Sequence, residues 1–411
     1  MADLVLEANR CYLCKNPRCK ANCPISTPIP EVIALFKAGE IDKAGEMLFK
    51  NNPLSLVCSI VCPHEDQCRG NCIRGIKDEP VSFCEIETQV SKEYLENLKL
   101  EKEAELDERV AIIGGGPAGI TIAFILAQKG YKVTIFDSHD KIGGVLRYGI
   151  PEFRLPKSII DTYEEKLINL GVKIRPNTSI GPVITLDKLF FDGYKAIFIG
   201  TGVWNPKTLN IKGESLGNVH YAIDYLKSPE TYRLGNKVCV IGAGDVAMDA
   251  ARTAKRNGAN EVYILYRKGL ENAPATKVEL EGAISDGVKF ELFKSPIELT
   301  ENGVKYIETK NAIDEDGRVN TVTIEGTEGL FECDSIIIAV SQSPKNDIVS
   351  NTKGLETNKW GLLVTDEYGN TSRQGVFASG DVVTGAKTVV RAAAHAKIVA
   401  EEIDKYIKEY K

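Results

Sequence analysis

Residues 110–120 read Val-Ala-Ile-Ile-Gly-Gly-Gly-Pro-Ala-Gly-Ile, and this stretch decides the fold. The β-branched run before the glycines predicts a buried strand, and residues 120–128 predict a helix. A second apolar run, residues 132–136, ends on Asp137, which lies 23 residues after Gly114. Strand, glycine turn, helix and strand in this order predict a βαβ nucleotide-binding unit rather than an ordinary glycine-rich turn.

The glycines of this unit follow the G-x-G-x-x-G spacing. Gly114 allows a tight turn, Gly116 lets a pyrophosphate approach the backbone, and Gly119 lets the helix pack closely on the strand. The N-terminus of the helix attracts phosphate groups. An acid at the end of the second strand, here Asp137, accepts hydrogen bonds from ribose hydroxyls. The unit is therefore predicted to bind FAD or NAD.

Length and composition indicate a soluble protein of two or three domains, with 411 residues, 43% apolar and 26% charged residues. The formal net charge of −6 argues against nucleic acid or an anionic membrane as the main partner. The N-terminus lacks the basic region and apolar core of a signal peptide. No apolar run approaches the ~18 residues that a membrane span needs. The predicted location is the cytoplasm.

Nine of the 11 cysteines lie in the first 84 residues. A cytoplasmic protein is not expected to use them as a disulfide framework, so their crowding predicts metal or iron–sulfur binding. They form two arrays, which are Cys11-x2-Cys14-x4-Cys19-x3-Cys23-Pro24 and Cys58-x3-Cys62-Pro63 followed by Cys68-x3-Cys72.

The first array is similar to the bacterial ferredoxin run C-x2-C-x2-C-x3-C-P, with two residues added before the third Cys. Two arrays of four thiolates match two [4Fe–4S] clusters. The alternative is a pair of structural zinc sites, which also use C-x2-C pairs. Zinc sites usually separate two close pairs by a longer spacer, whereas here four cysteines fall within 13 residues and a Cys-Pro ends the run. The pattern favours iron–sulfur clusters.

The remaining N-terminal sequence predicts short helices. Residues 33–36 and 41–49 have amphipathic spacing, and residues 86–98 have helical spacing. Residues 93–109 are rich in Glu and Lys, which predicts a solvated helix that links two domains.

The nucleotide pattern recurs at residues 237–247, where Gly242 and Gly244 form the turn and Ala247 takes the third small position. Its second strand ends in Arg267-Lys268, where the first unit has an acid. An acid favours a free ribose 2′-hydroxyl, whereas Arg accommodates a 2′-phosphate. The second unit is therefore predicted to bind NADP, and the alternative is a solvated basic strand end.

Several stretches complete the two predicted nucleotide domains. Residues 143–151 are rich in turn residues, and residues 196–199 form an apolar strand that ends in Gly200-Thr201-Gly202. A strand at residues 335–340 is expected to return the chain to the first domain, before Gly380-Asp381 and a final helix. The predicted fold is α/β, with two doubly wound (Rossmann-like) domains, one inserted in the other, behind an α-helical iron–sulfur domain. The expected boundaries are 1–106 for the helical domain, 107–228 with 341–411 for the FAD domain, and 229–340 for the NADP(H) domain.

These features together resemble a family over essentially the whole chain. The family comprises the small subunit of NADPH-dependent glutamate synthase, the N-terminal half of dihydropyrimidine dehydrogenase and the large subunit of the NADH-dependent ferredoxin:NADP oxidoreductase. The resemblance rests on both Cys arrays, residues 143–151, Tyr266-Arg267-Lys268, and Gly380-Asp381 with Thr388-Val-Val. It implies two [4Fe–4S] clusters, FAD, NADP(H), and a partner subunit that carries the substrate site.

The resemblance also implies roles for individual residues. One cluster is assigned to Cys11, Cys14, Cys19 and Cys72, and the other to Cys23, Cys62, Cys68 and Glu87. The implied FAD residues are Gly114, Gly116, Pro117, Ala118, Gly119, Asp137, Gly144, Arg147, Thr201, Gly202, Gly380, Asp381, Thr388 and Val389. The implied NADP residues are Gly242, Gly244, Asp245, Val246, Arg267 and Lys268. The assignment leaves Cys58 as a packing residue, although Cys58 as the eighth ligand and Glu87 as a solvated carboxylate is an open alternative.

The predicted function is that of an electron-input subunit, which takes hydride from NADPH onto FAD and passes single electrons through the clusters. No acid–base constellation for a further substrate is evident in the sequence. Ala273-Pro274 stands where some relatives have a basic residue, which weakens the expectation of strict NADPH preference. A bifurcating NAD(P)H/ferredoxin oxidoreductase, with ferredoxin as partner, is the alternative.

Two other classes of protein would share some of these sequence features. A thioredoxin-reductase-type enzyme would need a C-x-x-C in the second nucleotide domain, where Cys239 and Cys333 are isolated in the sequence. A non-catalytic scaffold that holds zinc and nucleotide would lack flavin and iron. The colour and metal content of the purified protein distinguish the scaffold from the enzyme.

Overall fold

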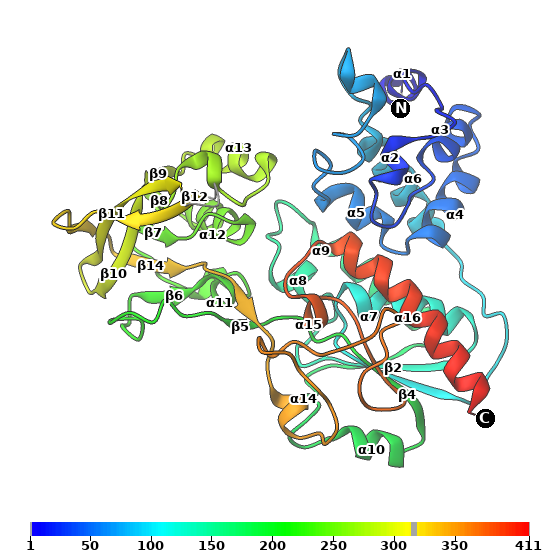
Figure 1. The fold of residues 1–411 in the computed structure, drawn as a ribbon. Helices are drawn as coiled ribbons and strands as arrows, with labels where there is room; N and C mark the ends of the chain where they lie inside the picture. The colour runs from blue at the N-terminus through cyan, green and yellow to red at the C-terminus, as the bar shows by residue number, and fades with distance from the viewer. Residues whose placement is uncertain (1, 314–318, 411) are drawn as a thin grey trace. The chain divides into compact units, whose positions relative to one another are not determined.

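The structure, a computed structural model, describes residues 2–313 and 319–410, which form two compact units (Figure 1). Unit 1 comprises the chain up to Arg147, Glu152–Val203 and the chain from Pro344 on, and unit 2 comprises Tyr148–Pro151 and Trp204–Ser343. The division into three domains with the boundaries given above stays a prediction. Among the described residues, no helix has both the length and the apolar character needed to cross a bilayer.

Unit 1 begins with a group of short helices. They are α1 (Ala2–Asn9), α2 (Arg18–Ala21), α3 (Ile29–Lys37), α4 (Ile41–Asn51), α5 (Ser55–Val61), the 3-10 helix η1 (Ile73–Ile76) and α6 (Phe83–Asn97). Their core contains Val32 and Phe36, four residues apart on α3, and Ile86 and Val90, four apart on α6. Residues at this spacing share one helix face, so each helix presents an apolar stripe to its neighbours.

The predicted linking helix at residues 93–109 is wrong beyond Asn97, where α6 ends. Leu98 is buried, and the backbone N–H groups of Glu103 and Leu106 donate to the carbonyls of Gln128 (2.7 Å) and Gly130 (3.1 Å). A helix would use these N–H groups internally. The tertiary hydrogen bonds therefore hold residues 98–108 out of the helical conformation that their Glu/Lys pattern predicts.

The first nucleotide fold of unit 1 contains a parallel five-stranded sheet in the order β16-β4-β1-β2-β3. Its strands are β1 (Arg109–Ile113), β2 (Lys132–Phe136), β3 (Lys173–Arg175), β4 (Tyr194–Ile199) and β16 (Val376–Ala378). The helices are α7 (Pro117–Gln128), α9 (Lys157–Asn169), α10 (Leu186–Phe191), α14 (Asp347–Ser350), α15 (Asp381–Thr384) and α16 (Val389–Glu409). The short helix α8 (Val145–Tyr148) belongs to unit 1 except for its last residue, Tyr148. β16 pairs with β4, so the part of the chain that follows Pro344 completes the sheet that contains β1.

Unit 2 contains a second parallel five-stranded sheet, in the order β6-β14-β7-β8-β9. Its elements are β6 (Val219–Tyr221), α11 (Ala222–Tyr225), η2 (Pro229–Thr231), β7 (Lys237–Ile241), α12 (Asp245–Arg256), β8 (Glu261–Tyr266), η3 (Leu270–Asn272), α13 (Lys277–Ser285), β9 (Lys289–Leu292) and β14 (Ser335–Ile338). The strand expected to return the chain to the first domain is β14, which lies between β6 and β7 and therefore belongs to the second sheet.

Two smaller sheets complete unit 2. An antiparallel sheet contains β10 (Lys294–Thr300), β11 (Gly303–Ile313), β12 (Val319–Thr323) and β13 (Gly329–Glu332). β5 (Asn205–Pro206) pairs with β15 (Gln342–Ser343). Because the carboxyl ends of parallel strands share one edge of a sheet, the turns after β1 and β7 lie at the ligand-binding edges of the two folds.

Candidate cofactor sites

The turn after β1 has the geometry that the first glycine motif predicts. Gly114 has a φ of +97°, and a Cβ there would lie 2.6 Å from the carbonyl oxygen of Gly200. A Cβ on Gly119 would lie 2.1 Å from the carbonyl oxygen of Gly114, so α7 packs directly on the turn. A Cβ on Gly116 would meet nothing closer than 3.9 Å, at Gly144. The backbone is thus open at the one glycine that a pyrophosphate is expected to approach.

Asp137 closes this turn from the end of β2. Its carboxylate is buried and accepts hydrogen bonds from the backbone N–H groups of Gly115 (2.7 Å) and His139 (2.9 Å). An ionised carboxylate has about four acceptor positions, so the role predicted for Asp137 toward a ribose is compatible with these contacts. The contacts also show that Asp137 fixes the shape of the turn.

The loop at Gly143-Gly144 lies against the same turn. Gly143 N–H donates to the carbonyl of Gly115 at 2.7 Å, and Gly144 has a φ of +51°. Arg147 was expected to bind the cofactor. In the structure its guanidinium contacts the carbonyl of Ile142 (2.8 Å) and the carboxylate of Asp161 (2.8 Å). These contacts make Arg147 a residue that holds the loop in place.

The last two predicted parts of the first site lie at the starts of α15 and α16. Gly380 (φ +77°) packs near Ala118 on the first turn of α7, because a Cβ on Gly380 would be 3.5 Å from the Ala118 Cβ. Burial raises the pKa of Asp381 to about 6, although Lys387 N–H donates to it at 3.1 Å. Thr388, the residue before α16, has a buried hydroxyl oxygen with no hydrogen-bond partner among the described residues.

These observations fit FAD. The open backbone at Gly116, the unpartnered Thr388 hydroxyl and the N-terminus of the long helix α16 are polar groups that a phosphate-bearing flavin would satisfy. The Gly200-Thr201-Gly202 turn lies beside Gly114, since a Cβ there would be 3.1 Å from the Thr201 Cα. The structure thus brings the predicted FAD residues of β1, β4 and α15 to one edge of the sheet.

His395 on α16 is part of this edge, although no sequence motif predicts a role for it. Its Nδ1 lies 2.9 Å from the hydroxyl of the buried Ser379, and its Nε2 lies 3.1 Å from the carbonyl of Glu367. Ser379 directly precedes Gly380-Asp381. His395 therefore helps to fix the turn that carries Asp381.

The turn after β7 in unit 2 repeats this geometry. Gly242 has a φ of +130°, and a Cβ there would lie 2.4 Å from the carbonyl oxygen of Ala339. A Cβ on Gly244 would meet nothing closer than 3.9 Å. Asp245, in the first turn of α12, was predicted to bind NADP, and its carboxylate accepts a hydrogen bond from Thr276 N–H at 2.8 Å. The carboxylate thereby anchors the loop that follows β8.

Arg267 and Lys268 follow the end of β8, as predicted. The carbonyl of Arg267 accepts a hydrogen bond from the hydroxyl of Thr309 (2.7 Å), and the carbonyl of Lys268 accepts one from Phe293 N–H (3.4 Å). The Arg267 side chain is exposed. Backbone anchors with an exposed guanidinium fit a site for a 2′-phosphate, because the charge can reach a ligand without moving the strand.

Cys239 and Cys333 are isolated in the sequence but not in space. Cys239 is in β7, Cys333 lies just before β14, and their side chains are hydrogen-bonded to each other. Burial raises the pKa of Cys239 well above its ordinary value. The parallel pairing of β7 with β14 brings the two residues together, which sequence spacing could not reveal.

The first group of N-terminal cysteines comprises Cys11, Cys14, Cys19 and Cys72. Burial raises the pKa of the Cys19 thiol to about 11, and the charges of Cys72 and Cys11 act in the same direction. Burial and the charges of Cys14 and Cys72 likewise raise the pKa of Cys11. These four thiols are thus electrostatic neighbours, although Cys72 is 53 residues from Cys19 in the chain.

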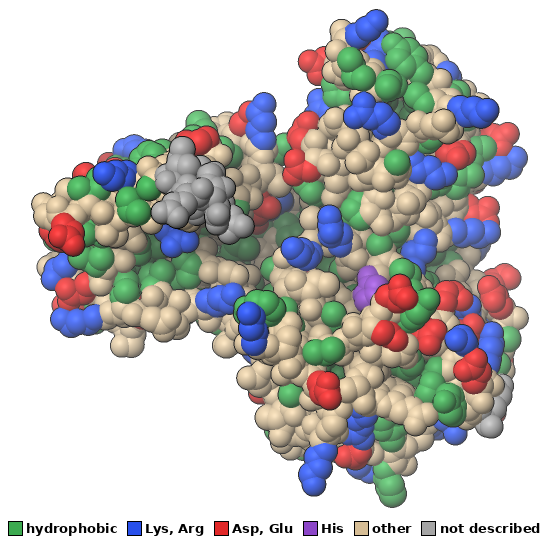
Figure 2. Space-filling model, viewed as in Figure 1, with side chains coloured by type: hydrophobic (Ala, Val, Ile, Leu, Met, Phe, Trp, Pro, Cys, Tyr) green, Lys and Arg blue, Asp and Glu red, His purple; other side chains and the backbone are tan. Residues whose placement is uncertain are grey.

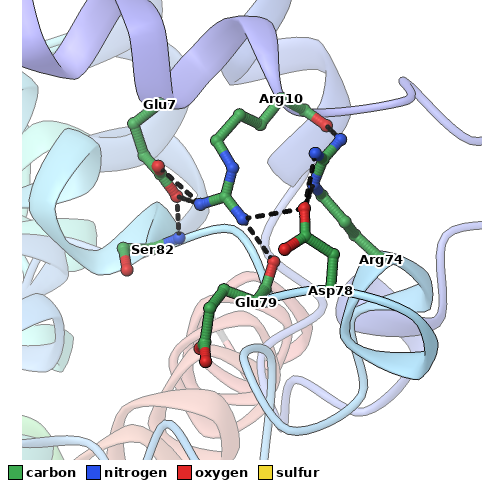
Figure 3. A network of polar contacts seen from close by, with 6 residues as sticks. All are labelled: Glu7, Arg10, Arg74, Asp78, Glu79 and Ser82. Carbon is green, nitrogen blue, oxygen red and sulfur yellow. Dashed lines mark hydrogen bonds and ion pairs between the residues drawn. The ribbon is translucent and has the colours of Figure 1, made fainter.

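A polar network holds the two segments of this group together (Figure 3). Arg74 donates to the carbonyl of Arg10 (3.1 Å) and to the carboxylate of Asp78 (2.7 Å). Arg10 donates to the carbonyl of Glu79 (2.5 Å) and pairs with Glu7. Glu7 in turn accepts a hydrogen bond from Ser82 N–H at 2.6 Å. The segment before Cys11 is therefore fixed to the segment after Cys72.

The second group comprises Cys23, Cys62, Cys68 and Glu87. A hydrogen bond with Cys58, followed by burial, raises the pKa of Cys62. Burial and the Glu87 carboxylate raise the pKa of Cys68. Glu87 is only 6% exposed, so its alternative assignment to a solvated helix face is wrong.

Buried thiols with raised pKa values fit a metal cluster, because bound metal supplies the positive charge that stabilises thiolate. Four of the assigned cysteines have such raised pKa values, Cys11 and Cys19 in the first group and Cys62 and Cys68 in the second, so both groups fit a metal cluster. Among the described residues, no three Cys, His, Asp or Glu side chains are gathered closely enough to hold a single metal ion.

The second group also contacts the predicted flavin edge. Cys23, Cys58 and Cys62 pack with Ile25 against the first turns of α16, at Val389, Val390, Ala393 and Ala394. The residue before that helix is Thr388, with its unpartnered hydroxyl. Lys397 of α16 further donates to the carbonyl of Asn51 at 2.5 Å. One end of α16 thus joins the two predicted cofactor regions of unit 1.

Comparison with known proteins agrees with this architecture. Residues 2–99 match the family described as dihydropyrimidine dehydrogenase domain II, 4Fe–4S cluster. Residues 108–396 match the family described as pyridine nucleotide-disulphide oxidoreductase. Among solved structures, FprA from Mycobacterium tuberculosis in complex with NADPH has a TM-score of 0.63 at 18% identity, over 74% of this chain and 85% of that one, which shows a shared fold.

Two curated relatives match nearly the whole chain. The putative oxidoreductase AegA of Escherichia coli is 33% identical over 97% of this chain, which spans 64% of that protein's length. The small chain of NADPH glutamate synthase of Escherichia coli is 31% identical over 98% of this chain and 91% of its own length. The chain is therefore an oxidoreductase of the glutamate synthase small-chain family, with a 4Fe–4S domain in front of a pyridine nucleotide-disulphide oxidoreductase fold.

Proposed function

We propose that the chain takes hydride from NADPH onto FAD and delivers single electrons, through two [4Fe–4S] clusters, to a partner subunit that reduces the substrate. When bound, FAD supplies the chemistry that converts a two-electron donor into a source of single electrons. The existence of a partner is supported by the relatives that are named small chain or subunit. The proposed electron path from FAD to the clusters is supported by the packing of Cys23 and Cys62 against α16.

This chain's own residues would bind and orient the cofactors. Arg267 and Lys268 would hold the 2′-phosphate of NADPH, while Gly242 and Gly244 leave backbone room for its pyrophosphate. In unit 1, Gly116 would let the FAD pyrophosphate approach, and Thr388 would donate its hydroxyl to the cofactor. The remaining predicted FAD and NADP residues would complete the two sites.

We assign one cluster to Cys11, Cys14, Cys19 and Cys72, and the other to Cys23, Cys62, Cys68 and Glu87. The electrostatic coupling of thiols within each group supports the grouping. The burial of Glu87 next to Cys62 and Cys68 supports a carboxylate ligand in the second group. Cys58 then acts as the hydrogen-bond partner of Cys62.

The test is turnover by the isolated full chain. With NADPH it should reduce an artificial acceptor such as ferricyanide, and it should not convert glutamine, pyrimidines or other metabolites. Absence of NADPH-dependent acceptor reduction in a preparation that contains flavin and iron would contradict the proposal. Conversion of a metabolite by the single chain would contradict the need for a partner.

A further inference from the structure

Apolar side chains are exposed around the first group of cysteines. Of the 20 large hydrophobic residues that are exposed in the described chain, six lie within the short segments 5–13 and 73–76: Val5, Leu6, Tyr12, Leu13, Ile73 and Ile76. Leu6, Tyr12 and Ile76 are each more than 60% exposed. We refer to these six residues as the α1 face.

The two segments of the α1 face are held side by side. Arg74 donates to the carbonyl of Arg10 at 3.1 Å, and its guanidinium lies 5.4 Å from the ring centroid of Tyr12. Arg10 donates to the carbonyl of Glu79. The network in Figure 3 therefore holds the segment that ends at Arg10 next to the segment that contains Arg74.

Internal packing already uses the other side of these segments. On α1, Ala8 is buried and Leu4 packs against the helical core, whereas Val5 and Leu6 point to solvent. Large apolar patches that a protein exposes, especially where polar residues surround them, indicate sites of interaction with other proteins or with membranes. The space-filling view shows hydrophobic side chains between Lys and Arg side chains over the α1 end of unit 1 (Figure 2).

Charges at the edge of the α1 face indicate what would cover it. Lys15, Arg18 and Lys77, which lie close in the sequence to residues of the α1 face, are exposed. Asp78 and Glu79, which directly follow Lys77, are also exposed. Their negative charges make this edge a poor match for an anionic membrane. Opposed carboxylates on a protein surface would complement the three cations and fix its orientation.

The α1 face also has a place in the proposed electron path, on which this inference rests. Cys23 and Cys62 of the second group pack against α16. Cys11, Cys19 and Cys72 of the first group, together with Cys68 of the second, pack instead against the helical core formed by α1, α3, α4 and α6. We propose that the α1 face docks an electron-accepting protein subunit, whose own iron–sulfur or flavin centre lies beneath an apolar surface rimmed by carboxylates. Only single electrons cross this interface.

The first test is site-specific photocrosslinking in the cells that produce the chain. A photoreactive residue is placed at Leu6 or Ile76, and in control variants at Val183 or Phe191, which belong to unit 1 and are even more exposed. We expect Leu6 and Ile76, but not the controls, to capture one other polypeptide that contains an iron–sulfur or flavin centre. Capture of a second copy of this chain or of lipid, equal capture at the controls, or no capture at Leu6 and Ile76 would overturn the proposal.

The second test uses charge reversal at the rim. Lys77→Glu should lower the amount of the captured subunit that co-purifies with the full chain by about tenfold, as expected for a lost charge pair that fixes an interface. Lys353→Glu, an exposed control far along the chain, should leave co-purification unchanged. Equal co-purification by Lys77→Glu and wild type would contradict the docking surface.

NADPH–ferricyanide activity distinguishes a failure of the α1 face from a failure of the proposed function. Both variants should retain it, since neither residue lies at a cofactor site. If Lys77→Glu retains both the activity and normal partner binding, only the proposed role of the α1 face is contradicted. If the wild-type chain has no such activity, the proposed function itself is contradicted.

Discussion

The guanidinium group of Arg74 donates a 3.1 Å hydrogen bond to the backbone carbonyl of Arg10. This bond joins the residue directly before Cys11 to the residue two positions after Cys72. Ligands so far apart in the chain need a tertiary contact to meet, because the loop between them has a large closure entropy. The hydrogen bond between Arg74 and Arg10 is such a contact, close in the sequence to both Cys11 and Cys72.

Arg74→Gln should therefore weaken retention of the first cluster. Glutamine cannot make both the Arg10 and the Asp78 contacts, so Cys72 loses its fixed position relative to Cys11. We expect iron to fall from about eight toward about four per chain, as two four-iron clusters require. Lys43→Gln, which removes only an exposed pair with Glu40, is the matched control. Full iron content in Arg74→Gln would show that the network is not needed.

Glu87 and Cys58 compete for the role of eighth ligand, and two variants separate them. Cys58→Ala should keep about eight irons per chain, because Cys58 would lose only its hydrogen bond with Cys62. Glu87→Ala should lose one cluster or change its EPR signal, while the other cluster is unaffected. Iron loss in Cys58→Ala, together with two unchanged clusters in Glu87→Ala, would exchange the two roles.

Coenzyme choice is predicted to depend on Arg267. Arg267→Ala should weaken NADPH binding by about 1.5–3 kcal/mol, the range for a hydrogen bond to a charged group, and should affect NADH much less. Lys289→Ala is the control. Lys289 lies at the amino end of β9, whereas Arg267 follows the carboxyl end of the neighbouring parallel strand β8. Calorimetric titration measures both coenzymes. An equal loss for NADPH and NADH would show that Arg267 does not contact the 2′-phosphate.

Two glycines of the first motif should respond differently to alanine. Gly119→Ala places a Cβ 2.1 Å from the carbonyl oxygen of Gly114, so the protein should lose stability or fail to fold. Gly116→Ala meets nothing within 3.9 Å, so the protein should fold and yet retain less flavin. Thermal unfolding and the flavin-to-protein ratio measure the two effects. A folded Gly116→Ala variant with full flavin content would place the pyrophosphate elsewhere.

Asp381 should make the stability of the flavin-free chain depend on pH. Burial raises its pKa to about 6 from an ordinary value of 3.8, so the folded state binds the proton more tightly than the unfolded state. The contribution of Asp381 to stability is then largest below about pH 4 and is lost as pH rises through about 6. Asp381→Asn should raise the melting temperature at pH 8 relative to wild type, and this difference should disappear near pH 4. A difference that is the same at both pH values would exclude titration of Asp381 as its cause.

Local patterns predicted much of the fold and of the nucleotide turns. Gly114 and Gly242 adopt the positive φ values that the motifs require, and the amphipathic spacing of α3 and α4 places their apolar residues in the core. The antiparallel sheet β10–β13 was missed, because its strands are largely half-exposed and lack clear alternation.

Long-range contacts were beyond the reach of sequence patterns. The hydrogen bonds of Glu103 and Leu106 override a strongly helical composition, and the pairing of Cys239 with Cys333 depends on sheet order. The Arg10–Arg74 contact joins two charged residues that each have ordinary local surroundings. The burial of Glu87 on α6 likewise depends on how the helices pack rather than on residue spacing.

Electrons are proposed to enter this chain at FAD and to leave it through iron–sulfur clusters. Rapid mixing of anaerobic full-length protein with NADPH, followed by visible and EPR spectroscopy, tests this proposal most directly. We predict that flavin absorbance falls first and that the EPR signals of reduced [4Fe–4S] clusters appear afterwards, in a protein that contains iron and no stoichiometric zinc. A flavin spectrum that NADPH leaves unchanged, or a colourless protein with zinc in place of iron, would contradict it.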